Sequence, residues 1–236
     1  MIQEKVQLLN EQLKDRSAEE ILKTVSDAFG NKIRFASSMG AEDQVITHMI
    51  ATLAVPVKIF TLDTGRMFAE TYELIEKTVI RYDVQIEVMF PDAAEVEQMV
   101  NQNGINLFYH SVENRKLCCG VRKINPLRRA LEGMDAWITG LRRQQSPTRT
   151  QVQVVEWDQG NGLIKVNPLL EWTEEQLWNY IKANQIPYNT LHDKSFPSIG
   201  CQPCTRAVMP GEDIRGGRWW WENPETKECG LHARKH

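Results

Sequence analysis

Four of the five cysteines in this chain of 236 residues occur as two close pairs. Cys118 and Cys119 are adjacent, and a CxxC motif places Cys201 three residues before Cys204. Because residues 120–200 separate the pairs, only folding can bring them together. Four thiolates in two clusters suit a tetrahedral zinc site or a 4Fe-4S cluster. A zinc knuckle needs two residues between its thiols, whereas adjacent thiolates can bind different irons of a larger cubane, which favours iron-sulfur.

Two other interpretations of these pairs stay open. Cys118 and Cys119 could be buried core thiols, since free cysteine is among the most buried residue types. The motif at 201–204 could be a thioredoxin-like redox pair, although that would require a βαβ context, which this part of the chain lacks. An odd count of five cysteines excludes a fully paired disulfide framework.

The fifth cysteine, Cys229, lies in the segment 228–232, with the sequence ECGLH. His232 and the basic segment 233–235 can hold part of this thiol as thiolate, the form that attacks electrophiles. Glycines and a proline within 216–224 indicate a segment that can move over a pocket and away again. We therefore predict that Cys229 is a nucleophile; the alternative is an unremarkable cysteine near the chain end.

The elements that must position these residues begin with an alternating pattern. Strand-like runs at 32–36, 57–61 and 84–88 enclose segments of helical period at 42–54 and 67–81. A β-α-β-α-β order predicts a parallel sheet covered by helices. The other expected elements are a helix over 5–29 with a capping box at Ser17 and Glu20, helices over 92–103 and 113–132, a strand at 136–139, a hairpin of 152–156 with 163–166, and a helix over 174–183 capped by Thr173.

Ligands of open parallel sheets bind beyond the carboxyl ends of the strands. The first such turn, 36–43, carries Ser37, Ser38 and Gly40 and leads into a helix whose N-terminus can bind phosphate; an ordinary capped helix start is the alternative. The second turn, 62–66, contains a glycine and an arginine. Two such turns side by side predict a nucleotide pocket, although neither matches the common dinucleotide or phosphate-loop motifs.

Charge excludes some partners and favours others. With 28 basic and 31 acidic residues the net charge is −3, which argues against a general nucleic-acid binder. Basic residues nevertheless gather without acidic neighbours in 114–131 and 140–150, and Arg215 and Arg218 flank two glycines. These patches predict a small polyanion held from several sides, although a solvated helix face is the usual reading of a charge run. No apolar run of membrane-spanning length or secretory signal is evident, so we expect a cytoplasmic protein that does not bind membranes.

Together these motifs resemble the assimilatory adenylylsulfate reductases of the phosphoadenylylsulfate reductase family. The most specific matches are 118–123 (CCGVRK), 140–146 (GLRRQQS), the pair at 201–204 and 228–232 (ECGLH). The resemblance implies an α/β fold with a single doubly wound, mostly parallel sheet, adenine nucleotide alpha hydrolase-like. It also implies a nucleotide-binding domain over 1–210 that carries the cluster, and a mobile C-terminal catalytic segment over 211–236.

The resemblance also assigns roles to residues. Cys229 is the implied catalytic nucleophile. The implied ligands of a 4Fe-4S cluster are Cys118, Cys119, Cys201 and Cys204. The residues implied to bind the substrate are Ser37, Ser38, Gly40, Leu62, Thr64, Gly65, Arg66, Lys123, Arg142, Arg143, Arg215, Arg218 and His232.

The activity implied is reduction of adenylylsulfate (APS) to sulfite and AMP, in sulfate assimilation for cysteine biosynthesis. Cys229 attacks the sulfate sulfur, and thioredoxin, or glutaredoxin, releases sulfite from the resulting S-sulfocysteine. The cluster is expected to position Lys123 and not to donate electrons.

Several alternatives stay open. One is reduction of the 3′-phosphorylated substrate (PAPS), or of both substrates. An ATP-dependent tRNA thiolation enzyme would need an SGGxDS-type loop and a basic RNA-binding surface, which the chain lacks, and a zinc-bound nucleotide sensor would be colourless. The residues Trp219, Trp220 and Trp221 suit a core, a docking surface for the tail or a subunit contact, and whether the chain forms a homo-oligomer is left open.

Overall fold

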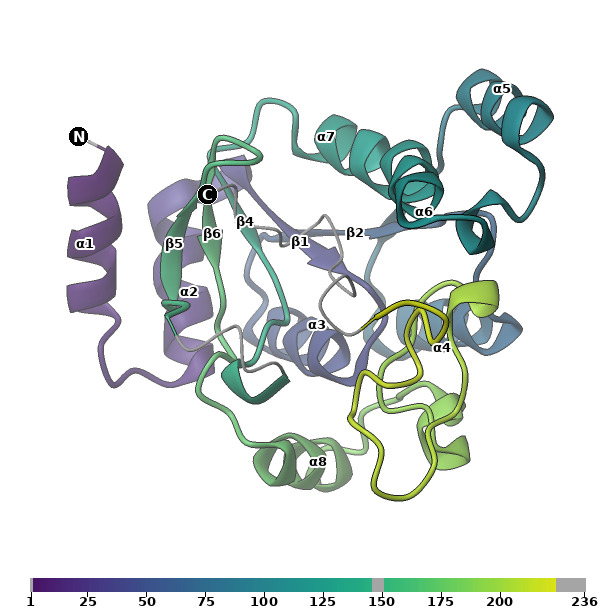
Figure 1. Ribbon diagram of the computed structural model, residues 1–236. Helices are drawn as coiled ribbons and strands as arrows, with labels where there is room; N and C mark the ends of the chain where they lie inside the picture. Colours follow the sequence, from purple (N-terminus) through teal and green to yellow (C-terminus); the bar gives the residue numbers. More distant parts are fainter. Residues whose placement is uncertain (1, 146–150, 224–236) are drawn as a thin grey trace. The chain divides into compact units, whose positions relative to one another are not determined.

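The computed structural model describes residues 2–145 and 151–223 (Figure 1). The chain divides into two compact units, each built from three stretches of sequence. Unit 1 comprises Met1–Thr61, Glu73–Glu87 and Gly133–Asn189. Unit 2 comprises Leu62–Tyr72, Val88–Glu132 and Thr190–His236. The domain boundary expected at residue 210 stays a prediction.

A six-stranded sheet forms the framework, with the strand order β3-β2-β1-β4-β6-β5. Its strands are β1 (Ile33–Ser37), β2 (Lys58–Leu62), β3 (Ile86–Met89), β4 (Ala136–Ile138), β5 (Val155–Asp158) and β6 (Leu163–Val166). β1 pairs in parallel with β2 and β4, β4 pairs in parallel with β6, and only β5 is antiparallel to β6 among the pairings described. The expected single, mostly parallel sheet is confirmed.

Helices precede, connect and follow the strands along the chain. They are α1 (Ile2–Gln12), α2 (Ala18–Phe29), α3 (Ala41–Leu53), α4 (Ala69–Tyr82), α5 (Ala93–Asn103), α6 (Val112–Cys119), α7 (Asn125–Leu131) and α8 (Glu174–Ala183). The capping box expected before α2 is present, with the Ser17 hydroxyl accepting from Glu20 N. The expected Thr173 cap of α8 is confirmed and is itself part of a capping box, with the Thr173 hydroxyl accepting from Gln176 N. These caps satisfy N–H groups that would otherwise lack a partner at the helix starts.

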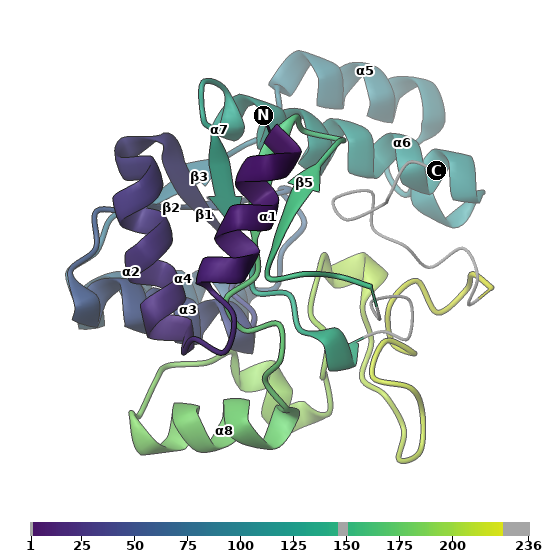
Figure 2. The same ribbon diagram turned by 90° about the vertical axis from the view of Figure 1, so that its left-hand side faces the viewer.

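The core of unit 1 lies between the sheet and the apolar faces of its helices. Phe35 on β1 and Val45 on α3 are fully buried, as is Leu22 on α2. α1 lies beside the edge strand β5 in both views (Figures 1 and 2). There the amide of Asn10 donates to the Val155 carbonyl at 2.7 Å and accepts from its N–H at 3.0 Å, so that one side chain satisfies backbone groups of the sheet edge.

Three expected elements differ from those observed. The helix expected over 5–29 is interrupted, because Asp15 adopts a left-handed φ of 59° between α1 and α2. The helix expected over 113–132 is divided by a π-helical turn, Gly120–Ile124. The first hairpin strand begins at Val155 instead of 152.

Unit 2 has a small core of its own. Met99 on α5 packs with Leu107, Phe108, Cys204 and Trp219. Trp219, only 1% exposed, is therefore a core residue, whereas the neighbouring Trp220 is exposed. Within residues 2–145 and 151–223, no helix is long and apolar enough to cross a membrane.

Candidate functional site

Unit 2 contains a cavity to which both cysteine pairs contribute. Its lining consists of four cysteines, five cations and three further residues: Cys118, Cys119, Cys201, Cys204, Arg66, Arg115, Arg122, Lys123, Arg218, Phe108, Pro203 and Trp219. None of the described residues lining it is acidic. The fold thus gathers two pairs that are far apart in sequence and surrounds them with positive charge.

The first pair is placed by α6 and the turn that follows it. Positions three and four apart lie on the same face of a helix, so Cys118 and Cys119 at the end of α6 share a face with Arg115. The π-helical turn then begins directly after Cys119. Such turns add one residue to a helical turn and are frequent at functional sites, and here Arg122 and Lys123 reach the same cavity.

The second pair lies in a tight 3₁₀ turn. The N–H of Cys204 donates to the Cys201 carbonyl at 2.9 Å, and the Gln202 N–H donates to the Arg66 carbonyl at 2.8 Å. An isolated antiparallel bridge joins Thr205 to Arg218. This bridge holds Arg218 beside the cysteine turn.

Cys201 lies in surroundings that favour its thiolate. Its sulfur is 3.2 Å from the hydroxyl oxygen of Thr64, whose carbonyl accepts a hydrogen bond of 2.7 Å from Arg122. Burial opposes ionisation, but the charge of Lys123 and the hydrogen bond with Thr64 outweigh it, so the pKa of Cys201 lies below its ordinary value. Thiolate is the form that binds metal.

The neighbouring thiols resist ionisation. Burial, followed by the charge of Cys201, raises the pKa of Cys204 to about 12, and burial also raises the pKa of Cys118. A second thiolate in such a site therefore needs a metal to compensate its charge. Within the described parts of the chain, no three His, Cys, Asp or Glu side chains are grouped about a position for one metal ion. Four soft donors around a cationic cavity fit a larger, anionic 4Fe-4S cluster better than a single zinc ion.

The predicted substrate-binding residues are distributed over both units. In unit 1 lie Ser37, Ser38, Gly40, Arg142 and Arg143; in unit 2 lie Leu62, Thr64, Gly65, Arg66, Lys123, Arg215 and Arg218. Cys229 and His232 lie outside the described residues.

In unit 1, the turn after β1 is organised by a buried carboxylate. Oδ2 of Asp43 accepts hydrogen bonds of 2.6 Å from both the N–H and the hydroxyl of Ser38. The Ser37 hydroxyl accepts from the N–H of Met39, which adopts a left-handed φ of 61° although it is not a glycine. Gly40 is the N-cap of α3. Asp43 therefore fixes the backbone of the predicted phosphosulfate loop.

We expect Asp43→Asn to change how stability depends on pH. Burial outweighs the Ser38 hydrogen bonds and raises the pKa of Asp43 from 3.8 to about 6. As pH rises, the unfolded chain therefore releases this proton before the folded chain does, so ionisation of Asp43 destabilises the folded state between these values. Relative to the variant, the wild type should lose about 2 kcal/mol of unfolding free energy from pH 4.5 to 7.5.

Urea unfolding of both proteins at the two pH values measures this effect. Asp27→Asn, at an exposed position outside the turn, is the matched control for the loss of one carboxylate. A stability difference between wild type and Asp43→Asn that stays constant with pH would contradict the assignment.

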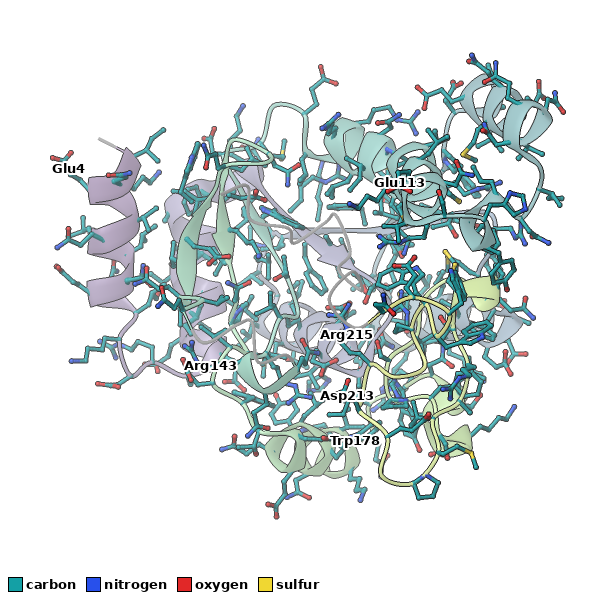
Figure 3. All side chains as sticks on the ribbon, viewed as in Figure 1. Glu4, Glu113, Arg143, Trp178, Asp213 and Arg215 are labelled. Atoms are coloured by element: carbon teal, nitrogen blue, oxygen red, sulfur yellow. The ribbon has the colours of Figure 1, made fainter. Side chains whose placement is uncertain are left out.

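Two predicted arginines of unit 1 are already paired. Nε of Arg142 donates to Oε1 of Glu42 at 2.8 Å, and Arg142 is 5% exposed. Arg143 forms an ion pair with Glu171 (Figure 3 labels Arg143). Carboxylates thus offset part of the positive charge that the sequence suggests, and contact of these arginines with a substrate stays a prediction.

In the turn after β2, as in unit 1, residues predicted to bind the substrate also form hydrogen bonds within the protein. Gly65 has a left-handed φ of 69°, and its N–H donates to a carboxylate oxygen of Asp63 at 2.7 Å. The Arg66 guanidinium donates to the Ile105 carbonyl at 3.1 Å and to the Asn106 side chain at 2.9 Å. Arg66 therefore supports the neighbouring loop as well as lining the cysteine cavity.

The loop before Trp219 carries Arg215 and Arg218. Figure 3 labels Arg215 and Asp213 on this loop, where the Arg215 N–H donates to a carboxylate oxygen of Asp213 at 2.8 Å. The guanidinium of Arg218 contacts the Ser198 hydroxyl at 3.4 Å and the Ile199 carbonyl at 3.3 Å. Arg218 is thus held in the cavity wall.

Gly200→Ala should displace Arg218 with little effect on folding. A Cβ at Gly200 would overlap the guanidinium at the far end of the long Arg218 side chain, whereas a Cβ at Gly217 would overlap the backbone carbonyl of Arg206. We expect Gly200→Ala to lower the unfolding free energy by about 1 kcal/mol, and Gly217→Ala by about 3 kcal/mol. If Arg218 binds the substrate, Gly200→Ala should also raise KM at least about tenfold. If Gly200→Ala left KM unchanged, Arg218 would not be a substrate-binding residue.

Sequence reasoning did not select four residues that shape these sites. They are Asp43, Asp63, Arg115 and Arg122, all buried. The position of Asp43 in the first turn of a helix after a strand could have identified it. Arg115 and Arg122 belong to the basic segment 114–131 noted in the sequence, but the pairing of Arg115 with Glu222, 107 residues away, could not be found.

Comparison with known proteins identifies the family. Residues 32–207 match the family described as the phosphoadenosine phosphosulfate reductase domain. The chain belongs to this family. An adenosine 5′-phosphosulfate reductase of the family from Allochromatium vinosum is 53% identical over 205 residues, covering 87% of this chain and 80% of the relative.

Solved structures agree with the fold of this phosphosulfate reductase family. The phosphoadenylyl-sulfate reductase from Candida auris, solved as a phosphate complex, has a TM-score of 0.74 and 29% identity, covering 87% of this chain and 97% of the other. A yeast FAD synthetase in complex with FAD has a TM-score of 0.55 and 16% identity, covering 87% and 66%. The expected adenine nucleotide alpha hydrolase-like fold class is confirmed.

Proposed function

We propose that this chain is a cytoplasmic enzyme that reduces APS to sulfite and AMP, with thioredoxin or glutaredoxin as reductant. The observation that carries the proposal is the cavity of four cysteines and five cations in unit 2. It occurs in a chain that is 53% identical to a protein named as an adenosine 5′-phosphosulfate reductase. The named relative supports APS as the substrate in preference to PAPS.

In the first step, the Cys229 thiolate attacks the sulfur of APS. A bond forms between Cys229 Sγ and the sulfate sulfur, while the bond from that sulfur to the phosphate oxygen breaks. AMP leaves with the electron pair, so no general acid is needed. Lys123, Arg218 and the other predicted basic residues stabilise the negative charge on the phosphate and sulfuryl oxygens.

In the second step, one thiolate of reduced thioredoxin attacks Cys229 Sγ in the S-sulfo-enzyme. Sulfite leaves, and a disulfide joins the two proteins. The second thioredoxin thiolate then attacks the thioredoxin sulfur of this disulfide and regenerates the Cys229 thiolate. The dithiol supplies both electrons, so the balance requires no further reductant.

Four cysteines are the proposed ligands of a 4Fe-4S cluster: Cys118, Cys119, Cys201 and Cys204. When bound, the cluster supplies a local electrostatic field and links α6 to the cysteine turn. The protein side chains have their own tasks. Thr64 and Lys123 favour the Cys201 thiolate, and Arg122 joins the turn after β2 to the π-helical turn through the Thr64 carbonyl.

The deciding experiment compares APS with PAPS as substrate under reduced thioredoxin. We expect kcat/KM for APS to exceed that for PAPS, with sulfite and AMP formed in equal amounts. A preference for PAPS would establish the alternative substrate, and absence of sulfite from both would overturn the proposal. Anaerobic purification adds a second readout, since about four irons per chain and absorbance near 400 nm are expected for this cluster, whereas zinc would be colourless.

A further inference from the structure

A phenol in unit 2 forms a hydrogen bond with the backbone inside the CxxC motif. The hydroxyl of Tyr109 donates to the Pro203 carbonyl at 2.6 Å, at the short end of the range for such bonds. The same peptide unit carries the Cys204 N–H, which donates to the Cys201 carbonyl at 2.9 Å. Both polar groups of this peptide unit therefore have partners, and Tyr109 supplies one of them from 94 positions away.

Aromatic neighbours hold the ring of Tyr109 in place. The ring centroid of Trp221 lies 4.4 Å from that of Tyr109, with an angle of 67° between the rings. On another side, the centroid of Phe108 lies 4.6 Å away, and Phe108 is itself buried in the wall of the cysteine cavity. Because packing already restricts this ring, its hydroxyl is directed at the carbonyl with little further loss of side-chain freedom.

The backbone of Tyr109 leads directly into the helix that carries the first cysteine pair. Tyr109 is the last residue of the 3₁₀ turn Leu107–Tyr109. Two residues later, Ser111 is the N-cap of α6, and its hydroxyl accepts from the Asn114 N–H at 3.1 Å. The last residue of α6 is Cys119. The phenol therefore connects the start of this helix to the turn that carries the second cysteine pair.

We propose that the Tyr109 hydroxyl positions the cysteine turn relative to α6, so that all four cysteines can bind one 4Fe-4S cluster. The inference rests on the proposed function, because the spacing of the pairs matters only if the cavity holds that cluster. Groups that hydrogen-bond around metal ligands orient those ligands, and their loss weakens metal binding. Tyr109 is a positioning residue, since it acts through the peptide unit next to Cys204.

Loss of the hydroxyl should leave the fold intact and loosen the site. Tyr109 is 42% exposed, so water can replace the phenol at the Pro203 carbonyl. Water satisfies this carbonyl but does not connect it to the start of α6. The cysteine turn then moves away from α6 more often, and a chelator reaches the iron sooner. Because one hydrogen bond changes an equilibrium about fivefold, we expect iron loss to accelerate by about this factor.

Two conservative variants test the inference. Tyr109→Phe removes the hydroxyl and keeps the ring with its packing. Tyr180→Phe is the matched control, because the Tyr180 hydroxyl donates to a Glu19 carboxylate oxygen at 3.2 Å in unit 1. Each variant thus loses one phenol hydrogen bond, but only Tyr109→Phe alters the cysteine turn.

The measurement uses the anaerobic holoenzymes mixed with excess EDTA, and follows the loss of absorbance near 400 nm. We expect Tyr109→Phe to lose this absorbance about fivefold faster than the wild type, and Tyr180→Phe to match the wild type. Resonance Raman spectra add a readout that a purely structural role would not change. The iron–cysteine stretching bands should shift in Tyr109→Phe alone, because they depend on the torsions of the cysteine side chains.

The outcomes separate this inference from the proposed function. A wild type without an iron-sulfur cluster would overturn the proposed cofactor and the inference together. If the wild type holds the cluster and Tyr109→Phe loses it no faster, or if Tyr180→Phe loses it equally fast, the inference alone is wrong. If Tyr109→Phe is isolated without iron, urea unfolding decides: the midpoint of the wild-type apoprotein would support the inference, and a lower midpoint would overturn it.

Discussion

Cys229→Ser is expected to abolish formation of the S-sulfo-enzyme, with a loss of at least about 10⁴-fold in its rate. A serine hydroxyl is not ionised at neutral pH and is a far weaker nucleophile toward sulfur than a thiolate. The four cysteines of the cavity do not substitute for it, since they are the proposed cluster ligands. Intact mass after incubation with APS, without reductant, measures the effect directly.

The variant must retain every other property of the enzyme. Iron content, absorbance near 400 nm and AMP affinity should equal those of the wild type, because Cys229 is not one of the four proposed cluster ligands. Sulfite production by Cys229→Ser at the wild-type rate would assign the nucleophile to another residue and overturn the mechanism.

Cys201→Ser is expected to reduce bound iron from about four per chain to fewer than one and to remove the absorbance near 400 nm. Cys201 is the thiol whose pKa the surrounding charges lower, so we expect it to bind iron most readily. A serine there provides a hydroxyl that resists deprotonation. Loss of the cluster also leaves the other thiols in a cationic cavity with no anion, so activity should fall with iron content.

Thr64→Val provides the matched control for this prediction. It removes the hydroxyl 3.2 Å from Cys201 Sγ but keeps the side-chain shape and all four thiols. Iron should therefore stay bound in Thr64→Val. Full iron content in Cys201→Ser would show that this cysteine is not a ligand, and bound zinc in the wild type would replace the iron-sulfur proposal.

Local sequence patterns predicted the bounds of a helix well where the capping residues and the apolar periodicity indicate the same start. The helix expected over 174–183 coincides with α8, because Thr173 and Gln176 form a capping box before a regular apolar stripe. The break at Asp15 was missed although local signals mark it, since aspartate is enriched in the left-handed region and the Ser17–Glu20 capping box marks a helix start. The π-helical turn after Cys119 was hidden, because one extra residue barely disturbs the apolar period.

For the site, residue chemistry was more informative than residue charge. Thiols are rare, so two spaced pairs indicated a shared site, and the structure places all four around one cavity. Arginines are common and serve many purposes. Nothing local indicates that Glu42 pairs with Arg142 across 100 positions, or that Arg115 meets Glu222 across 107. Such long-range pairs decide which cations remain for a ligand, and only the folded chain reveals them.

The stretches of unit 2 alternate along the chain with those of unit 1, and this order determines when the cysteine cavity can assemble during synthesis. The three stretches of unit 2 are separated by parts of unit 1, so Cys118 and Cys119 are synthesised well before Cys201. At about 5–20 residues per second, the ribosome needs roughly 4–16 s to translate the residues between them. During this interval the first pair has no partner, and the core around Trp219 closes later still. Delivery of a cluster to the nascent chain is therefore expected only after the last segment of unit 2 has emerged from the ribosome.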